Sequence, residues 1–509
     1  MILGKSLAHT ATLHPDRPAV IFDEQVWSHR ELQERVYRLA NALSALGYAK
    51  GDRIAVLGRN SHRYLEISLA LGLTGIVMVP INHRLLPAEV ATRLDHAGVT
   101  GLLVEPEFFD LSREAATASL ARSPTIVMDD EQTLGALNYE SLLQNGEPRP
   151  PSTTVDPEDA LYLGYTSGTT GQAKAAIVSH RAIVVGFLYK ALQYQIGTNQ
   201  TTLNPGFYWH SAPRDFALLQ IYLGGTAVVM REFEPRRCLE LIQTHQVSNG
   251  FFVPTMLQLM MELPDFAAFD VRSLQVLLSG GAPLPTSIKT AALERFGPII
   301  HEFYAATETR IVTSITPQEL EVKTRSVGRP VRDVDVRILD DAGSEVPLNE
   351  VGEIYLKTPT LFSGYHNDPD KTAAAFRDSW FSLGDMGRQD ADGYVYLVDR
   401  RHDMIISGGE NIYPSEIEDV LLRHPAVADV AVIGVPHEKW GEAVKAVVVL
   451  HDGQHGSADE LTASCAEHLA DYLKPRSYDF VDELPRNPTG KVLKRVLRDP
   501  YWHDREVNL

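Results

Sequence analysis

Short apolar runs rich in β-branched residues alternate with amphipathic helical patterns along most of this chain, and that alternation limits the possible folds most strongly. The runs predicted to be strands are residues 54–57, 101–104, 125–128, 226–230 and 274–278. Between them lie helical patterns, such as 30–46 and 235–245, whose apolar positions recur every three or four residues. Alternation of strand and helix predicts a layered α/β fold with largely parallel sheets.

A different pattern begins near residue 400. The charged segment 399–403 (Asp-Arg-Arg-His-Asp) is followed by a glycine turn at Gly408 and Gly409. Beyond this turn the chain predicts helices over 414–423 and 458–471 and strands over 430–435 and 443–450. We therefore predict a large, multi-layered α/β domain over residues 1–399 and a small, mobile α+β lid domain over residues 400–509. A lid on a short connector is typical of enzymes that close over a substrate.

Composition restricts the partners of the chain. It carries 66 acidic and 47 basic residues, a net charge of −19 with histidine neutral. A surface of this charge repels nucleic-acid phosphates, and the sequence shows only a short basic patch at 491–498, so we expect no nucleic-acid partner. The two cysteines, Cys238 and Cys465, lack metal-ligand spacing, fit a reducing compartment and exclude a disulfide scaffold.

The sequence also predicts a cytoplasmic protein. The N-terminal residues lack the pattern of a signal peptide. The longest uncharged stretch, 67–83, contains Thr74, Pro80 and Asn82 and falls short of the ~20 apolar residues that cross a bilayer. We predict that it is a buried helix running into a buried strand.

The segment 161–174, Leu-Tyr-Leu-Gly-Tyr-Thr-Ser-Gly-Thr-Thr-Gly-Gln-Ala-Lys, is the most informative one. It predicts a strand, then a loop rich in hydroxyl groups and glycine, before a helix that begins near Ser179. Backbone N–H groups, hydroxyls and a lysine together suit a polyphosphate. It is not a Walker loop, because Lys174 does not follow a glycine directly. Alone, such a run is more often a surface turn.

Five further segments follow this one in order: Ser279-Gly-Gly-Ala-Pro283, Tyr304-Ala-Ala-Thr-Glu308, Trp380-Phe-Ser-Leu-Gly-Asp385, Asp399-Arg400 and Pro488-Thr-Gly-Lys491. Together the six motifs resemble those of the AMP-forming adenylate ligase superfamily, which includes acyl-CoA synthetases, adenylation domains of peptide synthetases and beetle luciferases. The resemblance covers essentially the whole chain. Within the superfamily, the aryl-CoA ligases of the chlorobenzoate type look nearest.

The resemblance implies a role in ATP binding for each motif. The phosphate loop corresponds to Thr166, Ser167, Gly168, Thr169, Thr170, Gly171 and Lys174. The adenine site corresponds to Gly280, Gly281, Ala282 and Tyr304. Thr307 corresponds to a hydroxyl that contacts phosphate, and Glu308 to the carboxylate that binds Mg²⁺. Asp385, with Arg400 beside it, corresponds to the acid that binds the ribose hydroxyls.

Further residues are implied for the acid and for CoA. Tyr208-Trp-His210 resembles the aromatic-His motif beside the carboxylate pocket, which we expect to be lined by Tyr208, His210, Arg214 and Ala305. By the same resemblance, CoA contacts are expected at Arg84, Gly408, Gly409, Trp440, Tyr472 and Lys474. For Arg214, two roles stay open: pairing with a polar or anionic substituent of the substrate, or an ion pair with Asp215.

The catalytic residues implied by the family are Lys491, Thr170, Lys174, Glu308 and His210. His402 lies at the hinge, where Asp or Lys is usual. The chain departs from the family pattern at Ala173, Ala175, Leu383, Ala305 and His402. None of these departures removes a charged group that is expected to act in catalysis.

The resulting hypothesis is an ATP- and Mg²⁺-dependent ligase that joins a carboxylic acid to CoA through an acyl-adenylate. Two alternatives stay open: transfer of the acyl group to a separate carrier protein, and a nucleotide or acyl sensor without turnover. The sequence leaves open whether the acid is aromatic, short-chain, medium-chain or dicarboxylic, and whether the protein is a homodimer.

Overall fold

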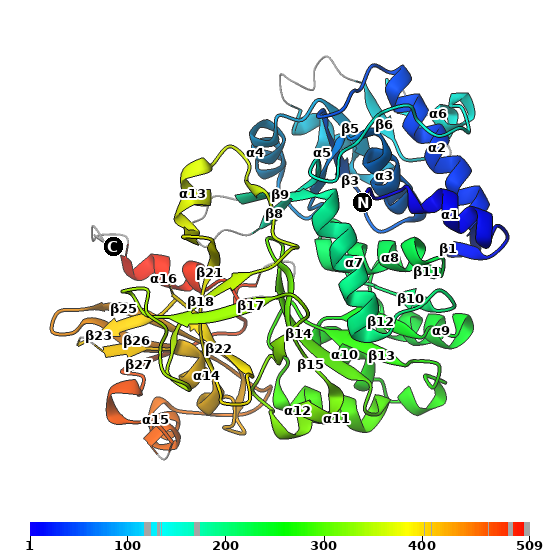
Figure 1. Cartoon of the computed structure of the whole chain (residues 1–509). Helices are drawn as coiled ribbons and strands as arrows, with labels where there is room; N and C mark the ends of the chain where they lie inside the picture. The colour runs from blue at the N-terminus through cyan, green and yellow to red at the C-terminus, as the bar shows by residue number, and fades with distance from the viewer. Residues whose placement is uncertain are drawn as a thin grey trace. The chain divides into compact units, whose positions relative to one another are not determined.

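The computed structural model describes residues 1–116, 124–129, 133, 135–166, 174–401, 403–408, 410–466, 468–486 and 492–502 (Figure 1). The chain forms two compact units. The large unit contains Met1–Val334 and Lys357–Ala374, and the small unit contains Asp335–Leu356 and Ala375–Leu509. The chain thus leaves the large unit, returns to it and leaves again. The predicted hinge at residues 399–403 is a statement about movement of the small domain, and it stays a prediction.

The first sheet of the large unit is mainly parallel. Its strands, in spatial order, are β16 (Arg329–Pro330), β15 (Arg310–Ile315), β14 (Ile300–Ala306), β13 (Val276–Ser279), β12 (Asn249–Phe252), β10 (Thr201–Leu203), β11 (Thr226–Val229), β1 (Pro18–Phe22) and β2 (Gln25–Ser28). The strands from β14 to β1 pair in parallel, while β15, β16 and β2 join the edges in antiparallel pairs.

The second sheet of the large unit repeats this arrangement. Its strands, in spatial order, are β19 (Gly364–Tyr365), β9 (Lys174–Ser179), β8 (Ala160–Thr166), β4 (Val77–Ile81), β3 (Arg53–Leu57), β5 (Gly101–Val104), β6 (Thr125–Val127) and β7 (Leu137–Asn138). The strands from β8 to β7 pair in parallel, whereas β9 pairs antiparallel with both β8 and β19. The predicted α/β class and parallel sheets are confirmed.

Helices pack around both sheets (Figure 1). They are α1 (Ser6–Leu13), α2 (His29–Ala45), α3 (His62–Thr74), α4 (Pro87–Ala97), α5 (Phe109–Glu114), α6 (Tyr139–Asn145), α7 (His180–Tyr194), α8 (Ser211–Leu223), α9 (Pro235–His245), α10 (Pro254–Met261), α11 (Thr286–Phe296), α12 (Pro317–Val322) and α13 (Pro369–Ala374). As predicted for residues 67–83, α3 is buried over most of its length and β4 over all of it. Among the described residues, no helix is long and apolar enough to cross a membrane.

One strand differs from the prediction. The sequence predicted a loop and then a helix that begins near Ser179; α7 confirms the start of the helix, but the strand β9, which was not predicted, lies between the loop and α7. The apolar run of residues 175–178 forms this strand, and the Ser179 side chain then caps α7 by accepting a hydrogen bond from the N–H of Ala182. The strands β8 and β9 therefore form an antiparallel pair.

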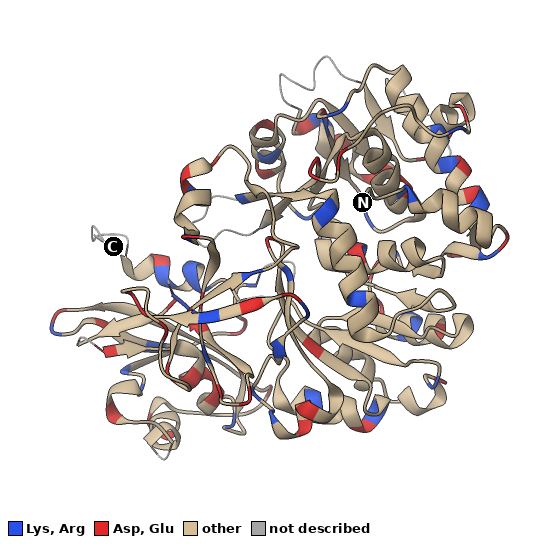
Figure 2. Cartoon of the chain, in the orientation of Figure 1, with Lys and Arg blue, Asp and Glu red and all other residues tan. Residues whose placement is uncertain are grey.

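The small unit contains two more sheets. The first has β17 (Asp335–Leu339), β18 (Gly352–Lys357), β21 (Trp380–Gln389) and β20 (Phe376–Arg377), with β22 (Val395–Arg400) paired to β21. The second has β24 (Glu410–Ile412), β23 (Ile405–Ser407), β26 (Gly441–Leu450) and β25 (Val427–His437), with β27 (Ser477–Phe480) paired to β26. Its helices are α14 (Pro414–Leu421), α15 (Ala458–Ala466) and α16 (Lys494–Trp502). Acidic and basic residues are interspersed along the ribbon of the chain (Figure 2).

A buried histidine makes the stability of the large unit depend on pH. The imidazole of His180 is fully buried, and its Nδ1 accepts the N–H of Leu3 at 3.2 Å. Burial lowers the pKa of His180 to about 4, against 6.5 for a free histidine. The contribution of neutral His180 to the free energy of unfolding is therefore complete above pH 6.5. It is lost as pH falls towards 4, because the histidine of the unfolded chain takes up a proton at a higher pH than that of the folded chain.

We predict that His180→Asn weakens this dependence. Up to about 3 kcal/mol of the acid-induced loss should disappear, since each pKa unit corresponds to about 1.4 kcal/mol. Urea unfolding between pH 7 and pH 4.5 measures the difference. Parallel pH profiles for the parent and the variant would show that His180 does not act in this way.

Candidate active site

Several predicted site residues lie outside the described residues: Ser167, Gly168, Thr169, Thr170, Gly171, His402, Gly409 and Lys491. The structure nevertheless describes both strands that carry the phosphate loop. Thr166 at the end of β8 pairs with Lys174 at the start of β9, so the two ends of the loop lie side by side. The predicted loop is therefore anchored on adjacent strands of the second sheet.

Lys174 lies over an aromatic ring from a distant part of the chain. Its Nζ is 5.2 Å from the centroid of the Tyr365 ring. The ring is held there because β19 pairs with β9, with Tyr365 opposite Ala176. The negative face of the ring attracts the ammonium group. This contact orients a cation at the end of the phosphate loop.

The same tyrosine holds Glu308. The Tyr365 hydroxyl donates a hydrogen bond of 2.9 Å to Glu308 Oε1, and the backbone oxygen of Glu308 accepts the N–H of Phe362 at 2.7 Å. The Glu308 side chain is buried. Tyr365 thus connects the predicted phosphate-binding lysine with the predicted metal-binding carboxylate. We name this arrangement the Lys174–Tyr365–Glu308 bridge.

The donors near Glu308 limit how a metal could bind. Within the part of the chain that the structure describes, no three His, Cys, Asp or Glu side chains cluster to hold an ion. A single carboxylate fits Mg²⁺, which commonly takes one or two protein carboxylates and completes its shell with water and substrate phosphates. Glu308 is consistent with that mode of binding.

Arg310, which the motif analysis missed, fixes the segment between Tyr304 and Glu308. It donates hydrogen bonds to the hydroxyl of Tyr162 at 2.7 Å and to the backbone oxygen of Thr307. It also forms a 3.0 Å ion pair with Asp215 of α8. These contacts join the predicted phosphate-contacting segment to β8 and α8. The only sequence signal is an arginine at the start of the apolar strand β15.

The predicted adenine segment follows β13. A Cβ on Gly280 would lie 2.8 Å from a ring carbon of Phe303 and 3.0 Å from its backbone oxygen, so only glycine fits. Gly281 has φ +85°, a conformation that also favours glycine. Because β13 and β14 are parallel neighbours, this turn and Tyr304 lie at the carboxyl ends of adjacent strands, where α/β sheets bind ligands.

The residues predicted to bind ribose are paired within the small unit. Asp385 on β21 stands opposite Arg400 on β22, and Arg400 Nε lies 3.2 Å from Asp385 Oδ1. Asp385 is buried. The neighbouring Arg401 binds Glu353 at 2.7 Å. The carboxylate of Asp385 is therefore held in one orientation.

Partly buried charges of the small unit anchor the chain next to residues 399–403 and 487–491. Asp399 accepts the N–H groups of Arg400 and Ser415, at 2.7 and 3.1 Å. Lys494, at the start of α16, forms a 2.8 Å ion pair with Glu418. The charge of Lys494 also acts on Asp399. The segment after the predicted catalytic lysine is thus tied to the predicted hinge.

The predicted acyl residues lie at the start of α8. The backbone N–H of Tyr208 donates to Asn60 at 2.7 Å, and the Tyr208 side chain is fully buried. His210 precedes the first residue of α8. Burial, together with the charge of Arg214, lowers the pKa of His210 to about 4, so the imidazole is neutral near pH 7. Ala305 is half-buried on β14.

Arg214 forms the ion pair that the sequence left open. Its Nη2 lies 3.6 Å from Asp215 Oδ1, and its guanidinium carbon lies 4.3 Å from the centroid of the Tyr162 ring. The side chain is almost completely buried. An ion pair does not exclude a role towards the substrate, which stays a proposal.

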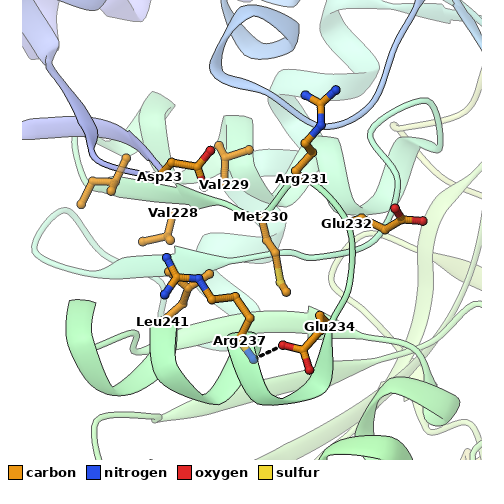
Figure 3. Close-up of a pocket in the computed structure, with 10 residues that line it drawn as sticks. Asp23, Val228, Val229, Met230, Arg231, Glu232, Glu234, Arg237 and Leu241 are labelled. Carbon is orange, nitrogen blue, oxygen red and sulfur yellow. Dashed lines mark hydrogen bonds between the residues drawn. The ribbon is translucent and has the colours of Figure 1, made fainter. Parts of the chain in front are cut away.

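In the large unit, the predicted CoA residue Arg84 lies beside a surface pocket. Its guanidinium is 4.4 Å from the centroid of the Phe207 ring and 3.5 Å from Glu232 Oε1. Glu232 lines the pocket together with Asp23, Arg231, Glu234 and Arg237 (Figure 3). Arg231 also binds Glu107 at 2.6 Å. The pocket therefore carries charges of both signs.

In the small unit, the other predicted CoA residues form two neighbouring groups. Gly408 has φ +63°, and its N–H donates to the backbone oxygen of Trp440 at 2.9 Å. Lys474 binds Asp471 at 3.1 Å, and Tyr472 is exposed. Arg476, which the sequence analysis missed, connects the two groups: it lies 5.2 Å from the Trp440 ring and 3.5 Å from Asp471. The sequence feature that could have indicated Arg476 is that it is a second basic residue close to Lys474.

Two family models match the chain. That of the AMP-binding enzyme matches residues 7–366, and that of the AMP-binding enzyme C-terminal domain matches residues 416–491. The chain belongs to the AMP-binding enzyme family. The resemblance seen in the six motifs is thereby confirmed at the level of the superfamily.

Similar proteins match this family member over nearly their whole length. A feruloyl-CoA synthase from an Amycolatopsis species is 36% identical, over 97% of this chain and 98% of that protein. The fatty acid–[acyl-carrier-protein] ligase ScoC from Streptomyces coeruleorubidus is 35% identical, over 99% and 98%. The ATP-bound structure of MatB from Rhodopseudomonas palustris has a TM-score of 0.89 at 28% identity, over 98% and 99%. The o-succinylbenzoate CoA synthetase MenE from Bacillus subtilis, solved with its acyl-adenylate OSB-AMP, has a TM-score of 0.87 at 30% identity, over 100% and 99%.

We predict that Gly280→Ala destabilises the AMP-binding enzyme and weakens its affinity for AMP. The added Cβ meets the ring and backbone of Phe303, and overpacking of this kind costs about 1–3 kcal/mol. Gly197→Ala is the matched control, since nothing lies within 4 Å of a Cβ there. Urea unfolding and calorimetric titration with AMP measure both effects. Equal behaviour of the two variants would contradict the prediction.

Proposed function

We propose that this chain is an ATP-dependent acid–CoA ligase. A carboxylate attacks the α-phosphorus of ATP to give an acyl-adenylate and pyrophosphate, and the CoA thiol then attacks the acyl carbonyl and expels AMP. The observation that carries the proposal is the full-length similarity to the feruloyl-CoA synthase, together with the two family models. The residues that the motifs single out support it.

The first step needs charge neutralisation and alignment more than a protein nucleophile. Lys174, held over Tyr365, supplies a cation for the phosphates of ATP. Thr307 lies in the segment that Arg310 fixes, where its hydroxyl would contact phosphate. When bound, Mg²⁺ would be held by Glu308 and would neutralise phosphate charge. The hydroxyls of residues 166–170 belong to the same proposal.

The acid would lie beside His210. A neutral imidazole can hydrogen-bond a carboxylate without forming a salt bridge, so the carboxylate stays nucleophilic. Tyr208 and Ala305 would border the acyl group. Adenine would lie along Gly280, Gly281 and Ala282 against Tyr304, and the ribose hydroxyls would bind Asp385, held by Arg400.

The second step requires CoA. Arg84 in the large unit, and Gly408, Gly409, Trp440, Tyr472 and Lys474 in the small unit, are proposed to contact it. Cations suit its phosphates, and aromatic faces suit its adenine or pantetheine. We add Arg476 to this set because it contacts the ring of Trp440.

A carrier protein is the second candidate acceptor. The relative ScoC is named as a fatty acid–[acyl-carrier-protein] ligase and is 35% identical to this chain.

The class of the acid is a separate question. The resemblance to aryl-CoA ligases of the chlorobenzoate type, which favours an aromatic acid, stays a proposal. The relatives include an indoleacetate–CoA ligase from Aromatoleum aromaticum and a long-chain fatty-acid ligase from Mycobacterium tuberculosis, so they do not agree on one class.

The test is AMP formation from ATP with aromatic, short-chain, medium-chain and dicarboxylic acids, each with CoA, with a phosphopantetheinylated carrier protein or with neither acceptor. CoA-dependent AMP release from at least one acid supports the proposal. Release that requires the carrier protein would support the second candidate. If no acid yields pyrophosphate, the remaining interpretation is a nucleotide or acyl sensor without turnover.

Lys491 provides the sharpest test of the two-step scheme. We propose that it reaches the carboxylate and the α-phosphate during adenylation and moves away when residues 400–509 rotate about 399–403. Lys491→Ala should lower pyrophosphate release ~10²–10³-fold. It should still convert a supplied acyl-adenylate to acyl-CoA at close to the parent rate.

The matched control is Arg495→Ala, which removes an exposed cation of the following helix. This variant should retain both half-reactions. Comparable losses of both half-reactions in the folded Lys491→Ala protein would show that the lysine is not confined to adenylation.

A further inference from the structure

Beside His210, the large unit contains a cluster of four buried charged side chains. Only Arg310 enters the two-step mechanism, through the segment of Thr307 that it fixes. Arg214 and Asp215 come from α8, Lys190 from α7 and Arg310 from β15. Each is at most 6% exposed. Arg310 pairs with Asp215 at 3.0 Å, and Arg214 lies 3.6 Å from the same carboxylate. We call these four residues the buried charge cluster.

The charges of this cluster do not cancel. It has three cations and the single carboxylate of Asp215, and Glu308 also acts on Arg310. Burial lowers the pKa of Lys190 to about 8, so its ammonium is still largely protonated near pH 7. His210 is neutral there and adds no charge. The buried region thus carries at least one excess positive charge, which is costly in a protein interior unless an anion joins it.

Hydrogen-bond donors around Arg214 also lack acceptors. Arg214 Nη2, which lies 3.6 Å from Asp215 Oδ1, and the hydroxyls of Tyr64 and Tyr208 are buried and make no hydrogen bond within 3.5 Å in the described structure. The charge of Arg214 acts on the Tyr64 hydroxyl, and the rings of Tyr64 and Tyr208 meet edge to face at 6.0 Å. Buried donors are nearly always satisfied in proteins, by protein atoms, by ordered water or by a ligand, so a water or a ligand is expected to meet this group.

We propose that Arg214, Tyr64 and Tyr208 recognise a second carboxylate of the acid substrate, so that the enzyme prefers dicarboxylic acids. This inference rests on the proposed function, because it assumes that His210 and Tyr208 border the acyl group. A second carboxylate would supply a negative charge that offsets the excess positive charge of the cluster. It would also accept hydrogen bonds from Arg214 and from the two tyrosine hydroxyls. A neutral hydroxyl substituent would satisfy a donor but would leave the excess charge in place.

The test compares two series of acids whose members differ only at the end far from the reacting carboxylate. The aliphatic series is glutaric acid, its monomethyl ester and pentanoic acid. The aromatic series is terephthalic acid, its monomethyl ester and 4-hydroxybenzoic acid. CoA-dependent AMP formation gives kcat and KM for each. We expect at least one diacid to exceed its monomethyl ester in kcat/KM by about 100-fold or more, since a site built to bind a polar substrate group rejects an analogue without that group by up to ~10⁴–10⁵. In Arg214→Leu the ratio should fall to about 3 or less, chiefly through a higher KM for the diacid.

Two controls separate recognition from folding. Arg236→Leu removes an exposed arginine paired with Asp265 and should keep the parent ratio. Lys190→Met removes a charge of the cluster with little change in volume and should lower the ratio several-fold. If the circular dichroism of Arg214→Leu shows that this variant does not fold, Lys190→Met still tests the inference.

The outcomes distinguish the inference from the function on which it rests. Equal use of the diacids and their monomethyl esters by the parent enzyme, or an unchanged ratio in Arg214→Leu, would overturn the inference and leave the ligase function in place. Preference for 4-hydroxybenzoic acid over terephthalic acid would assign the donors to a hydroxyl group instead. If no acid of this panel or of the broader panel above yields AMP, the proposed function fails, and the inference fails with it.

Discussion

The contact on which the candidate site depends most is the one that Tyr365 makes with two residues far away in the sequence. Its ring lies under the ammonium of Lys174, and its hydroxyl binds the carboxylate of Glu308. A cation and an anion that are both proposed to serve phosphate groups would otherwise attract each other and close the site. The tyrosine holds each by a different part of its side chain. The chain creates this contact by returning to the large unit between Lys357 and Ala374.

Burial determines the electrostatics of the remainder of the site. It keeps His210 neutral, so that residue can orient a carboxylate without neutralising it. Deeper in the large unit, Arg214 and Arg310 pair with the carboxylate of Asp215, and the charge of Asp215 also acts on Lys190. The same low polarity that strengthens these ion pairs makes the unbalanced charge unfavourable, and a charged substrate would relieve it. Under the proposal of a second carboxylate, substrate choice and stability are coupled in this region.

The sequence predicted the features that depend on local patterns. Strand and helix periodicities located α2, α9, β3 and β5 to within a residue or two. Ordered motifs, read through a family resemblance, located the residues expected to bind ATP. Tyr365, Arg310 and Tyr64 were missed because they act through strand pairing and burial, which no local pattern reveals. The sheet of β17, β18, β20, β21 and β22 was missed as well, since several of its strands, such as β17, β20 and β22, are short and largely half-exposed.

A double-mutant cycle tests most directly whether the Lys174–Tyr365–Glu308 bridge organises the site. Acid-dependent pyrophosphate release is measured for the parent, Tyr365→Phe, Glu308→Gln and the double variant. Tyr189→Phe, which also loses a hydroxyl bound to a carboxylate, serves as the control. If the hydroxyl acts through Glu308, Tyr365→Phe lowers the rate about 10-fold in the parent, the value of a hydrogen bond to a charged group, and changes it little in Glu308→Gln. Equal losses in both backgrounds would show that the two residues act independently, which contradicts the account.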